Sequence, residues 1–397
     1  MKPPSPSPAA EHLMLRLVAP RWSSPLDHQL RMLVPGGILL AGPLPPSPET
    51  MRELLGGISR CLPAPPILAL EVEDSADALS GLLPPLPSPR ALAQKGVRAV
   101  RQAGELLGEA LKLLGFNTYF AISLNLASDF TEQSTPAGTG DVPISDVAPG
   151  FSPARAALPT VSGQAPGGAT FKSGQQPCTF SADPRVVAEC GAAFAEGLSR
   201  HKILACAMHF PGLGGVPPAT NGELSVCGRS MAELWRRDLI PYRELLPRLP
   251  LVMMSTAAYK AYDFDYLQSA VLSAQVVEGL LRAKLGYRGV VIAPQLESST
   301  VRGPLDMGRA AVQSLDAGCD MLLVAEEASW QAMRQGIEDA LDSGVISRPQ
   351  LEQSVARIRA AKKGCKPPKG PFPKKSWDRL VRRVEEFNSG CREAERE

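Results

Sequence analysis

The stretch ILACAMHFPGLGGVPPATNG, residues 203–222, joins an apolar run to a loop rich in glycine and proline. The run over 203–210 is apolar except for His209, which is typical of a β-strand covered on both faces. Glycine and proline then end the strand and predict a loop. A buried strand followed by such a loop is typical of α/β proteins whose sites lie at strand ends.

Seven further apolar runs resemble this one. The eight predicted strands cover residues 13–19, 36–42, 67–73, 118–126, 203–210, 251–256, 289–294 and 320–326. Segments with helical periodicity lie between them, most clearly 91–114 and 266–285, which end at Gly115 and Gly286. Eight strands alternating with helices predict an α/β fold of the (β/α)8 barrel type, with the loop over 211–222 on its functional face. An open doubly wound sheet is the alternative, but no GxGxxG motif follows the first strand.

Composition excludes several classes of partner. A net charge of +2 over 397 residues gives no electrostatic basis for binding nucleic acid or an anionic membrane. No apolar run approaches about 18 residues, and the N-terminus lacks the apolar core of a signal peptide. The eight cysteines have no CxxC or metal-ligand spacing, and Cys206 and Cys319 are expected to be buried free thiols. We therefore expect a cytoplasmic protein without metal, cofactor, nucleic-acid partner or membrane partner.

The chain divides into a core and less regular segments. Residues 1–12 are expected to be a disordered N-terminus, and 13–363 the barrel, with 127–177 as a low-complexity insertion rich in Ser, Thr, Gly and Pro. Residues 364–397 comprise a basic proline-rich linker and a helix. The helix carries Trp377, Leu380, Val381 and Val384 at helical spacing. It either packs on the barrel, which we favour, or serves a protein partner through 366–397.

Several segments, taken in order, resemble one known family. They are GGILLAGPLPPSPETMRELLGGI (36–58), TFSADPRVVAECGAAFAEGL (179–198), VMMSTAAYKAYD (252–263), LLRAKLGYRGVVIAPQLE (280–297) and SGVISRPQLEQSVARIRAAK (343–362). Together with HFPG at 209–212, they resemble the family 3 glycoside hydrolases over about 13–363. The narrower resemblance is to the single-domain bacterial β-N-acetylglucosaminidases. It implies a (β/α)8 barrel and an amino-sugar or muropeptide-like ligand.

The resemblance also implies a chemistry against which the residues can be compared. Retaining glycosidases need a carboxylate nucleophile and an acid–base group about 5 Å apart. The resemblance places Pro294 at the nucleophile position, and Ala219 and Asn221 at the two positions of the acid–base dyad. None of these side chains can perform the corresponding step. Other charged positions of the family pocket hold neutral residues here, namely Asn125, Cys178, Met208 and Thr256.

Four polar residues remain as candidates for binding a ligand, and none is a candidate catalytic residue of the family type. They are Glu71, Asn125, His209 and Glu297. Three of them have a simpler interpretation: His209 as a satisfied histidine at a strand end, Glu297 as a solvated loop carboxylate, and Glu71 as a solvated or ion-paired residue. Glu71 and Glu73 share one face of a strand, so they could instead form a carboxylate pair with one raised pKa.

Three functions are consistent with these residues. The first is a catalytically inactive family 3 barrel that binds a carbohydrate or a protein. The second is an active glycosidase of the β-N-acetylhexosaminidase type with relocated groups drawn from Glu71, Glu73, His209 and Glu297. The third is an interaction protein that acts through the insertion and the C-terminal tail.

Overall fold

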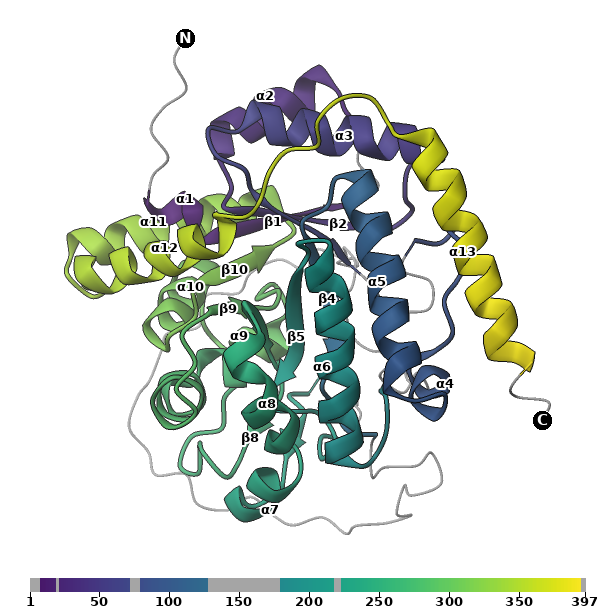
Figure 1. Cartoon of the computed structure of the whole chain (residues 1–397). Helices are drawn as coiled ribbons and strands as arrows, with labels where there is room; N and C mark the ends of the chain where they lie inside the picture. Colours follow the sequence, from purple (N-terminus) through teal and green to yellow (C-terminus); the bar gives the residue numbers. More distant parts are fainter. Residues whose placement is uncertain (1–7, 19–20, 72–78, 128–178, 218–222, 394–397) are drawn as a thin grey trace.

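Eight parallel strands close into a barrel surrounded by helices (Figure 1). This computed structural model describes residues 8–18, 21–71, 79–127, 179–217 and 223–393. The barrel strands are β1 (Leu13–Val18), β2 (Gly37–Ala41), β3 (Ile67–Glu71), β4 (Thr118–Ser123), β5 (Leu204–Phe210), β7 (Leu251–Met254), β9 (Val290–Ala293) and β10 (Met321–Val324). Their order around the barrel is β1-β10-β9-β7-β5-β4-β3-β2. The predicted (β/α)8 fold is confirmed, and every predicted strand overlaps one strand of the barrel.

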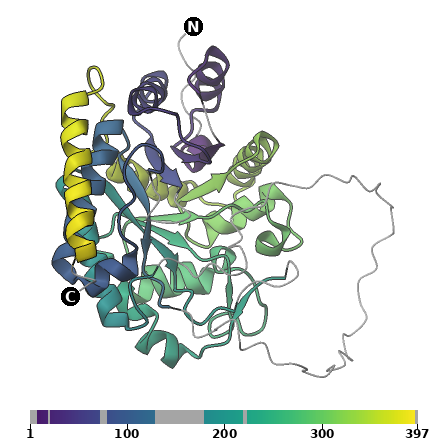
Figure 2. The same ribbon diagram turned by 90° about the vertical axis from the view of Figure 1, so that its right-hand side faces the viewer.

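The helices cover the outside of the barrel (Figure 2). They are α1 (Pro8–Glu11), α2 (Ser24–Leu33), α3 (Pro48–Cys61), α4 (Pro89–Gln94), α5 (Val97–Leu114), α6 (Pro184–Arg200), α7 (Met231–Arg236), α8 (Leu239–Leu245), α9 (Ser299–Arg302), α10 (Met307–Asp316), α11 (Glu327–Asp342), α12 (Arg348–Lys362) and α13 (Lys374–Glu393). Several start at a Ser or Asp whose side chain accepts a hydrogen bond from the first turn, with Pro directly after it, as at Ser47, Ser88 and Asp183. The Ser or Asp side chain satisfies a free backbone N–H of the first turn, and the Pro fixes φ near its helical value. These helix starts are therefore encoded locally.

Two predicted helices differ from the observed ones. The segment 91–114 is split into α4 and α5 by Lys95 and by Gly96, whose φ is +91°. The segment 266–285 is helical only as a 3₁₀ turn (Ala270–Leu272) and a π-helix (Gln275–Lys284). Residues 266–269 instead belong to a loop, because Ser269 pairs with Ala258. The apolar periodicity over 266–285 therefore begins before the helical residues do.

Apolar side chains fill the barrel in layers. Alternate residues of each strand point inward and form one packed cluster, which contains Met14, Leu39, Ile67, Ala69, Phe120, Cys206, Leu251, Met253, Val290, Ile292, Met321 and Leu323. Burying them removes apolar surface from water, and this burial is the main driving force of folding. Cys206 and Cys319 are buried free thiols, as predicted.

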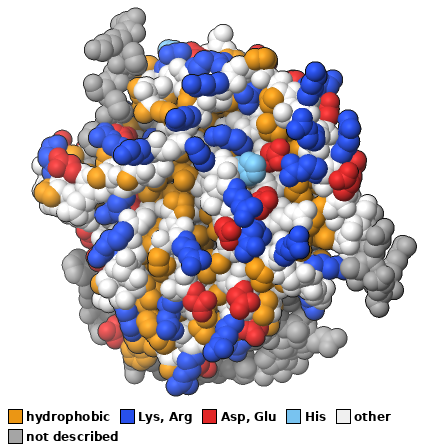
Figure 3. Space-filling model, viewed as in Figure 1, with side chains coloured by type: hydrophobic (Ala, Val, Ile, Leu, Met, Phe, Trp, Pro, Cys, Tyr) orange, Lys and Arg blue, Asp and Glu red, His pale blue; other side chains and the backbone are white. Residues whose placement is uncertain are grey.

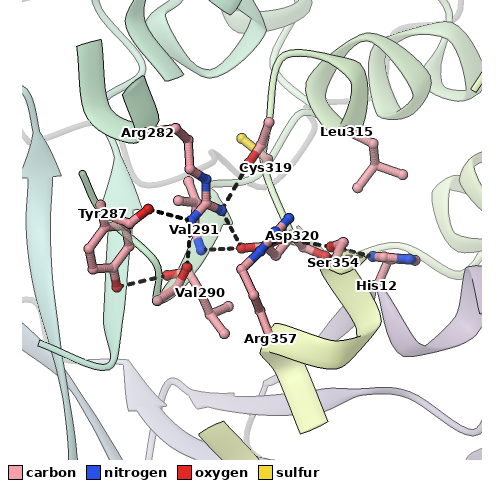
Figure 4. A network of polar contacts seen from close by, with 12 residues as sticks. His12, Arg282, Tyr287, Val290, Val291, Leu315, Cys319, Asp320, Ser354 and Arg357 are labelled. Atoms are coloured by element: carbon pink, nitrogen blue, oxygen red, sulfur yellow. Dashed lines mark hydrogen bonds and ion pairs between the residues drawn. The ribbon is translucent and has the colours of Figure 1, made fainter. Parts of the chain in front are cut away.

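A buried polar network lies at the amino-terminal end of the strands (Figure 4). Asp320, directly before β10, is fully buried and accepts hydrogen bonds from Arg282 (2.6 Å), Ser354 (2.8 Å) and Arg357 (2.9 Å). His12 donates through Nδ1 to the Asp320 carbonyl oxygen at 2.7 Å, and burial lowers the pKa of its imidazole. The network ties β1, β9, β10 and α12 together at the end of the barrel opposite the loops that follow the strands.

The N-terminal boundary differs from the expected one. Residues 8–12 fall within the segment expected to be disordered, but Pro8–Glu11 form α1, and residues 9–12 are buried. Arg359 of α12 donates to both carboxylate oxygens of Glu11, at 3.1 and 2.5 Å, which holds α1 against the barrel. Residues 1–7 lie outside the described part of the chain, as do residues 128–177 of the predicted insertion.

The C-terminal helix packs on the barrel, as we favoured. Helix α13 lies beside α5 in both views, and its apolar residues Trp377, Leu380 and Val384 are buried (Figures 1 and 2). An ion pair joins Arg383 to Glu109 of α5 at 2.6 Å. The exposed side of the helix carries charges of both signs, and Lys and Arg are interspersed with Asp and Glu on the face shown in Figure 3. The apolar face of the helix is therefore covered by the barrel. A protein partner that binds through 366–397 is not tested by these contacts and stays a prediction.

Candidate functional site

The candidate site is built from loops at the carboxyl ends of the strands, the functional face of such barrels. Its centre is the loop after β5, which we call the site loop and define as residues 209–217. Asn125, which follows β4, is buried, and its Oδ1 accepts hydrogen bonds from the backbone N–H of His209 (3.2 Å) and Leu213 (3.0 Å). Asn125 therefore anchors the site loop, a structural role that uses its carbonyl oxygen.

His209 lies at the start of the site loop and is partly buried. Desolvation by burial lowers the pKa of its imidazole to about 4. The ring is therefore neutral at neutral pH and has one N–H donor and one acceptor nitrogen. Such a group can bind a hydroxyl, and it is too weak a base to hold a proton at pH 7.

A buried ion pair lies directly beneath the site loop. Arg229 pairs with Asp238, whose side chain is fully buried. Burial raises the pKa of the Asp238 carboxyl, and the Arg229 guanidinium opposes that rise. Gly212 has a φ of +123°, and a Cβ there would lie 2.9 Å from the Cβ of Asp238. Only glycine fits between the loop backbone and this pair, which explains the glycine-rich sequence on structural grounds.

The segment that follows the neighbouring barrel strand β7 also contacts the site loop. Ser255, after β7, donates its N–H to the carbonyl of Phe210 at 2.7 Å. The hydroxyl of Tyr259 donates to the carbonyl of Gly212 at 2.6 Å. Burial raises the pKa of Tyr259 well above its usual value, so the hydroxyl keeps its proton. Hydrogen bonds from residues that follow β4 and β7 thus hold the loop backbone, and the Arg229–Asp238 pair packs against its glycines.

Pro294 and Glu297 follow β9. Pro294 is the first residue after the strand and is partly buried, at the position where the resemblance predicts a nucleophile. Glu297 Oε1 accepts a hydrogen bond from the backbone N–H of Ala325, after β10, at 2.7 Å. Its Oε2 is buried and has no hydrogen-bond partner among the residues that the structure describes. Glu297 is therefore a fixed carboxylate between two loops of the mouth and not a solvated one.

The remaining predicted residues cannot be placed in the site. Glu71 is the last residue of β3, but its side chain is not described, and Glu73 lies outside the described residues. The proposed carboxylate pair of Glu71 and Glu73 stays a prediction. Ala219 and Asn221, at the predicted dyad positions, also lie outside the described part of the chain.

Two polar features were not predicted from the sequence. One is the Arg229–Asp238 pair, whose members lie in separate segments that gave no motif. The other is Arg16 of β1, which follows Met14 at the two-residue spacing of one strand face. Met14 packs inside the barrel, so Arg16 lies on the inner face, in the half of β1 nearer the mouth. The sequence signal for Arg16 was that it is the one charged residue in the otherwise apolar run LMLRLV.

No metal-binding or membrane-spanning feature is found within the described ranges. Among those residues no group of three or more His, Cys, Asp or Glu could hold a metal ion. No described helix is long and apolar enough to cross a membrane.

Sequence comparison finds a family model and several relatives that each match just under half of the chain. Residues 171–361 match the family model "Glycosyl hydrolase family 3 N terminal domain". A β-hexosaminidase of Bordetella avium is 40% identical over 185 residues, which cover 46% of this chain and 49% of that protein. An uncharacterized secreted glycosyl hydrolase of Arthroderma benhamiae is 33% identical over 187 residues, 46% of this chain and 52% of that protein. The chain spans about half the length of the curated relatives it matches.

Structural comparison extends over nearly the whole chain but shows the fold alone. A family 3 β-N-acetylglucosaminidase of Paenibacillus superposes with a TM-score of 0.75 at 22% identity, covering 96% of this chain and 68% of that one. A β-N-acetylhexosaminidase of Beutenbergia cavernae superposes with a TM-score of 0.72 at 18% identity, covering 90% and 97%. The family model, the β-hexosaminidase relatives and the shared barrel together support a relationship between this chain and the family 3 glycoside hydrolases.

Proposed function

We propose that this chain binds an amino sugar of the N-acetylhexosamine class at the carboxyl-terminal mouth of its barrel. The observation that carries the proposal is the site loop, which Asn125 and Tyr259 hold in one conformation after β5. A loop fixed by contacts from two neighbouring strands is a preorganised binding element, since little entropy is lost when a ligand binds. The β-hexosaminidase relatives suggest the ligand class. A cytoplasmic location is part of this proposal.

We further propose that the mouth binds its ligand without hydrolysing it. Pro294 stands directly after β9 and has no group that could attack an anomeric carbon. His209, whose pKa is about 4, is neutral and cannot serve as a protonated acid at pH 7. Because nucleophile and acid–base group act as a unit, loss of the nucleophile alone lowers the rate by many orders of magnitude.

A second candidate function is hydrolysis by relocated groups, and Glu297 supports it. One of its oxygens is fixed by the Ala325 N–H, and the other is buried without a partner among the described residues. A positioned carboxylate at the barrel mouth is one half of what a glycosidase needs. The other half would be a second carboxylate about 5 to 9 Å away, for which Glu71 is the predicted candidate. The β-hexosaminidase relatives favour this alternative at least as strongly as binding alone.

One experiment separates the two functions. Binding of N-acetylglucosamine is measured by calorimetry, and hydrolysis of a chromogenic N-acetylglucosaminide is measured with the same protein. The variants are Glu297→Gln and, as matched control, Glu352→Gln at an exposed position of α12. Binding without turnover in all three proteins supports the non-hydrolytic function. Turnover that Glu297→Gln abolishes and Glu352→Gln retains establishes the glycosidase and overturns the non-hydrolytic proposal. Absence of both binding and turnover overturns both.

A further inference from the structure

An exposed aromatic tip projects from the loop after β7. We call residues 259–268 the aromatic loop. At its tip, Phe264 is 75% exposed and Tyr266 is 66% exposed, and Leu267 beside them is 43% exposed. Large aromatic side chains usually bury most of their surface, so neighbouring exposed rings indicate a contact surface.

The stem of this loop is ordered, so the rings are presented on a fixed base. An antiparallel bridge joins Ala258 to Ser269, and Ala270 donates its N–H to the carbonyl of Ala257 at 2.8 Å. These contacts close the base of the loop. Gln268 accepts a hydrogen bond from Gln313 of α10 at 2.8 Å. A compact loop with its ends pinned together is a frequent carrier of function.

The aromatic loop is joined directly to the candidate site. Its first residue, Tyr259, is buried and donates to Gly212 of the site loop at 2.6 Å. The two-stranded sheet of β6 (Val226–Cys227) and β8 (Ala258–Tyr259) connects the same two regions, since β6 follows the site loop along the chain. The base of the aromatic loop therefore lies on the end of the barrel that carries the mouth.

We infer that Phe264 and Tyr266 form an outer saccharide subsite, which binds the second and later sugar rings of an oligomeric amino-sugar ligand. Aromatic rings stack on the C–H faces of sugar rings, a contact that combines apolar burial with attraction to the π-face. The exposed carboxylate of Asp265, between the two aromatic residues, can accept hydrogen bonds from sugar hydroxyls. This inference rests on the proposed amino-sugar ligand and specifies that the ligand extends beyond one sugar.

Two other occupants fit the observations less well. Burying two aromatic side chains removes at most about 500 Å² of surface, below what a stable dimer interface needs. An anionic membrane surface is attracted by clustered basic residues, whereas an acidic residue, Asp265, separates these two rings. A saccharide needs only the small area of the two aromatic rings, and its hydroxyls can donate hydrogen bonds to the Asp265 carboxylate.

The test compares ligands of different length. N-acetylglucosamine and its β-1,4-linked tetramer are titrated by calorimetry into the wild-type chain and into Phe264→Ser/Tyr266→Ser. The matched control is Val345→Ser, an exposed apolar residue that is 65% exposed and precedes α12. We expect the wild-type chain and the control to bind the tetramer at least tenfold more tightly than the monosaccharide. The double variant loses about tenfold in tetramer affinity and keeps its monosaccharide affinity.

The possible failures are distinguishable. If the double variant binds the tetramer as tightly as the wild type does, or if the tetramer never binds better than the monosaccharide, the outer subsite is wrong and the proposed ligand class stands. If neither sugar binds the wild-type chain, both proposals are overturned. If the wild type sediments as a dimer and the double variant as a monomer, the rings are an interface between copies and the subsite is refuted.

Discussion

Asp320→Asn tests the buried network at the amino-terminal end of the barrel. The carboxylate of Asp320 accepts hydrogen bonds from Arg282 at 2.6 Å, the N–H of Val291 at 2.8 Å, Ser354 at 2.8 Å and Arg357 at 2.9 Å. Both oxygens of the carboxylate are used, and every group that faces them is a donor. An asparagine of the same size turns one acceptor into an NH₂ donor and removes the charge that balances Arg282.

The expected loss follows from burial. The Arg282 side chain is 5% exposed and that of Asp320 is fully buried, so the arginine cannot recover its hydration after the substitution. Removing one partner of a buried pair costs about 3–5 kcal/mol of the free energy of unfolding. The unfolding entropy of 397 residues, at about 2.1 cal/mol/K each, is about 0.8 kcal/mol/K. The melting temperature should therefore fall by about 4–6 °C.

The assay is thermal and urea unfolding followed by circular dichroism. The matched control is Asp27→Asn, which removes a carboxylate from a surface pair with Arg31 (2.8 Å) and should be much less destabilising, because solvent and salt screen an exposed pair. The stabilising role assigned to the network is refuted if Asp320→Asn is no more destabilising than this control. Such a result would mean that the network contributes no more than an exposed ion pair.

Three further predictions concern the site loop and the tail. Asn125→Ala leaves two backbone N–H groups of the site loop without their acceptor, so we expect a loss of about 2–4 kcal/mol in urea unfolding, together with weaker saccharide binding. His209 has a pKa lowered to about 4, so its stabilising contribution is complete above pH 6.5 and is lost as the pH falls from 6.5 towards 4. His209→Gln should make stability less dependent on pH over that window, with the remaining dependence due in part to buried His12, and an unchanged profile would contradict the assigned burial. Trp377→Ala removes a buried side chain between α13 and the barrel and should cost about 3–5 kcal/mol, whereas a helix that only awaits a partner would lose almost nothing.

The positions of the strands were predictable because the signals are local. An apolar run bounded by glycine or proline, such as 289–294 or 36–42, reports burial on both faces without reference to the rest of the chain. The predicted helix over 266–285 was wrong at its start for the opposite reason. Its apolar periodicity is correct, but the pairing of Ser269 with Ala258 competes with helix formation. Pairing across a loop is a tertiary contact, and it overrides local propensity.

The candidate site was predicted only in part. The sequence placed His209 and Asn125 at strand ends but could not show that Asn125 binds the backbone of His209, 84 residues away. It placed Glu297 in a loop, and the favoured solvated role was wrong because that loop meets the N–H of Ala325. No sequence motif predicts the Arg229–Asp238 pair, because its role depends on close packing against the glycine backbone of the site loop, which only the folded chain shows.

By itself the sequence determined the barrel, since each strand and each Ser-Pro or Asp-Pro helix start is encoded by neighbouring residues. That Pro294 stands where a family 3 glycosidase carries its nucleophile is what the resemblance implies, and it stays a prediction. Only the tertiary structure decided which polar groups meet: Asn125 with the site loop, Tyr259 with Gly212, and Asp320 with Arg282. It also decided that Phe264 and Tyr266 stay exposed on a pinned loop. The physical reason is that barrel closure joins loops distant in sequence, and their hydrogen bonds and burial depend on that geometry.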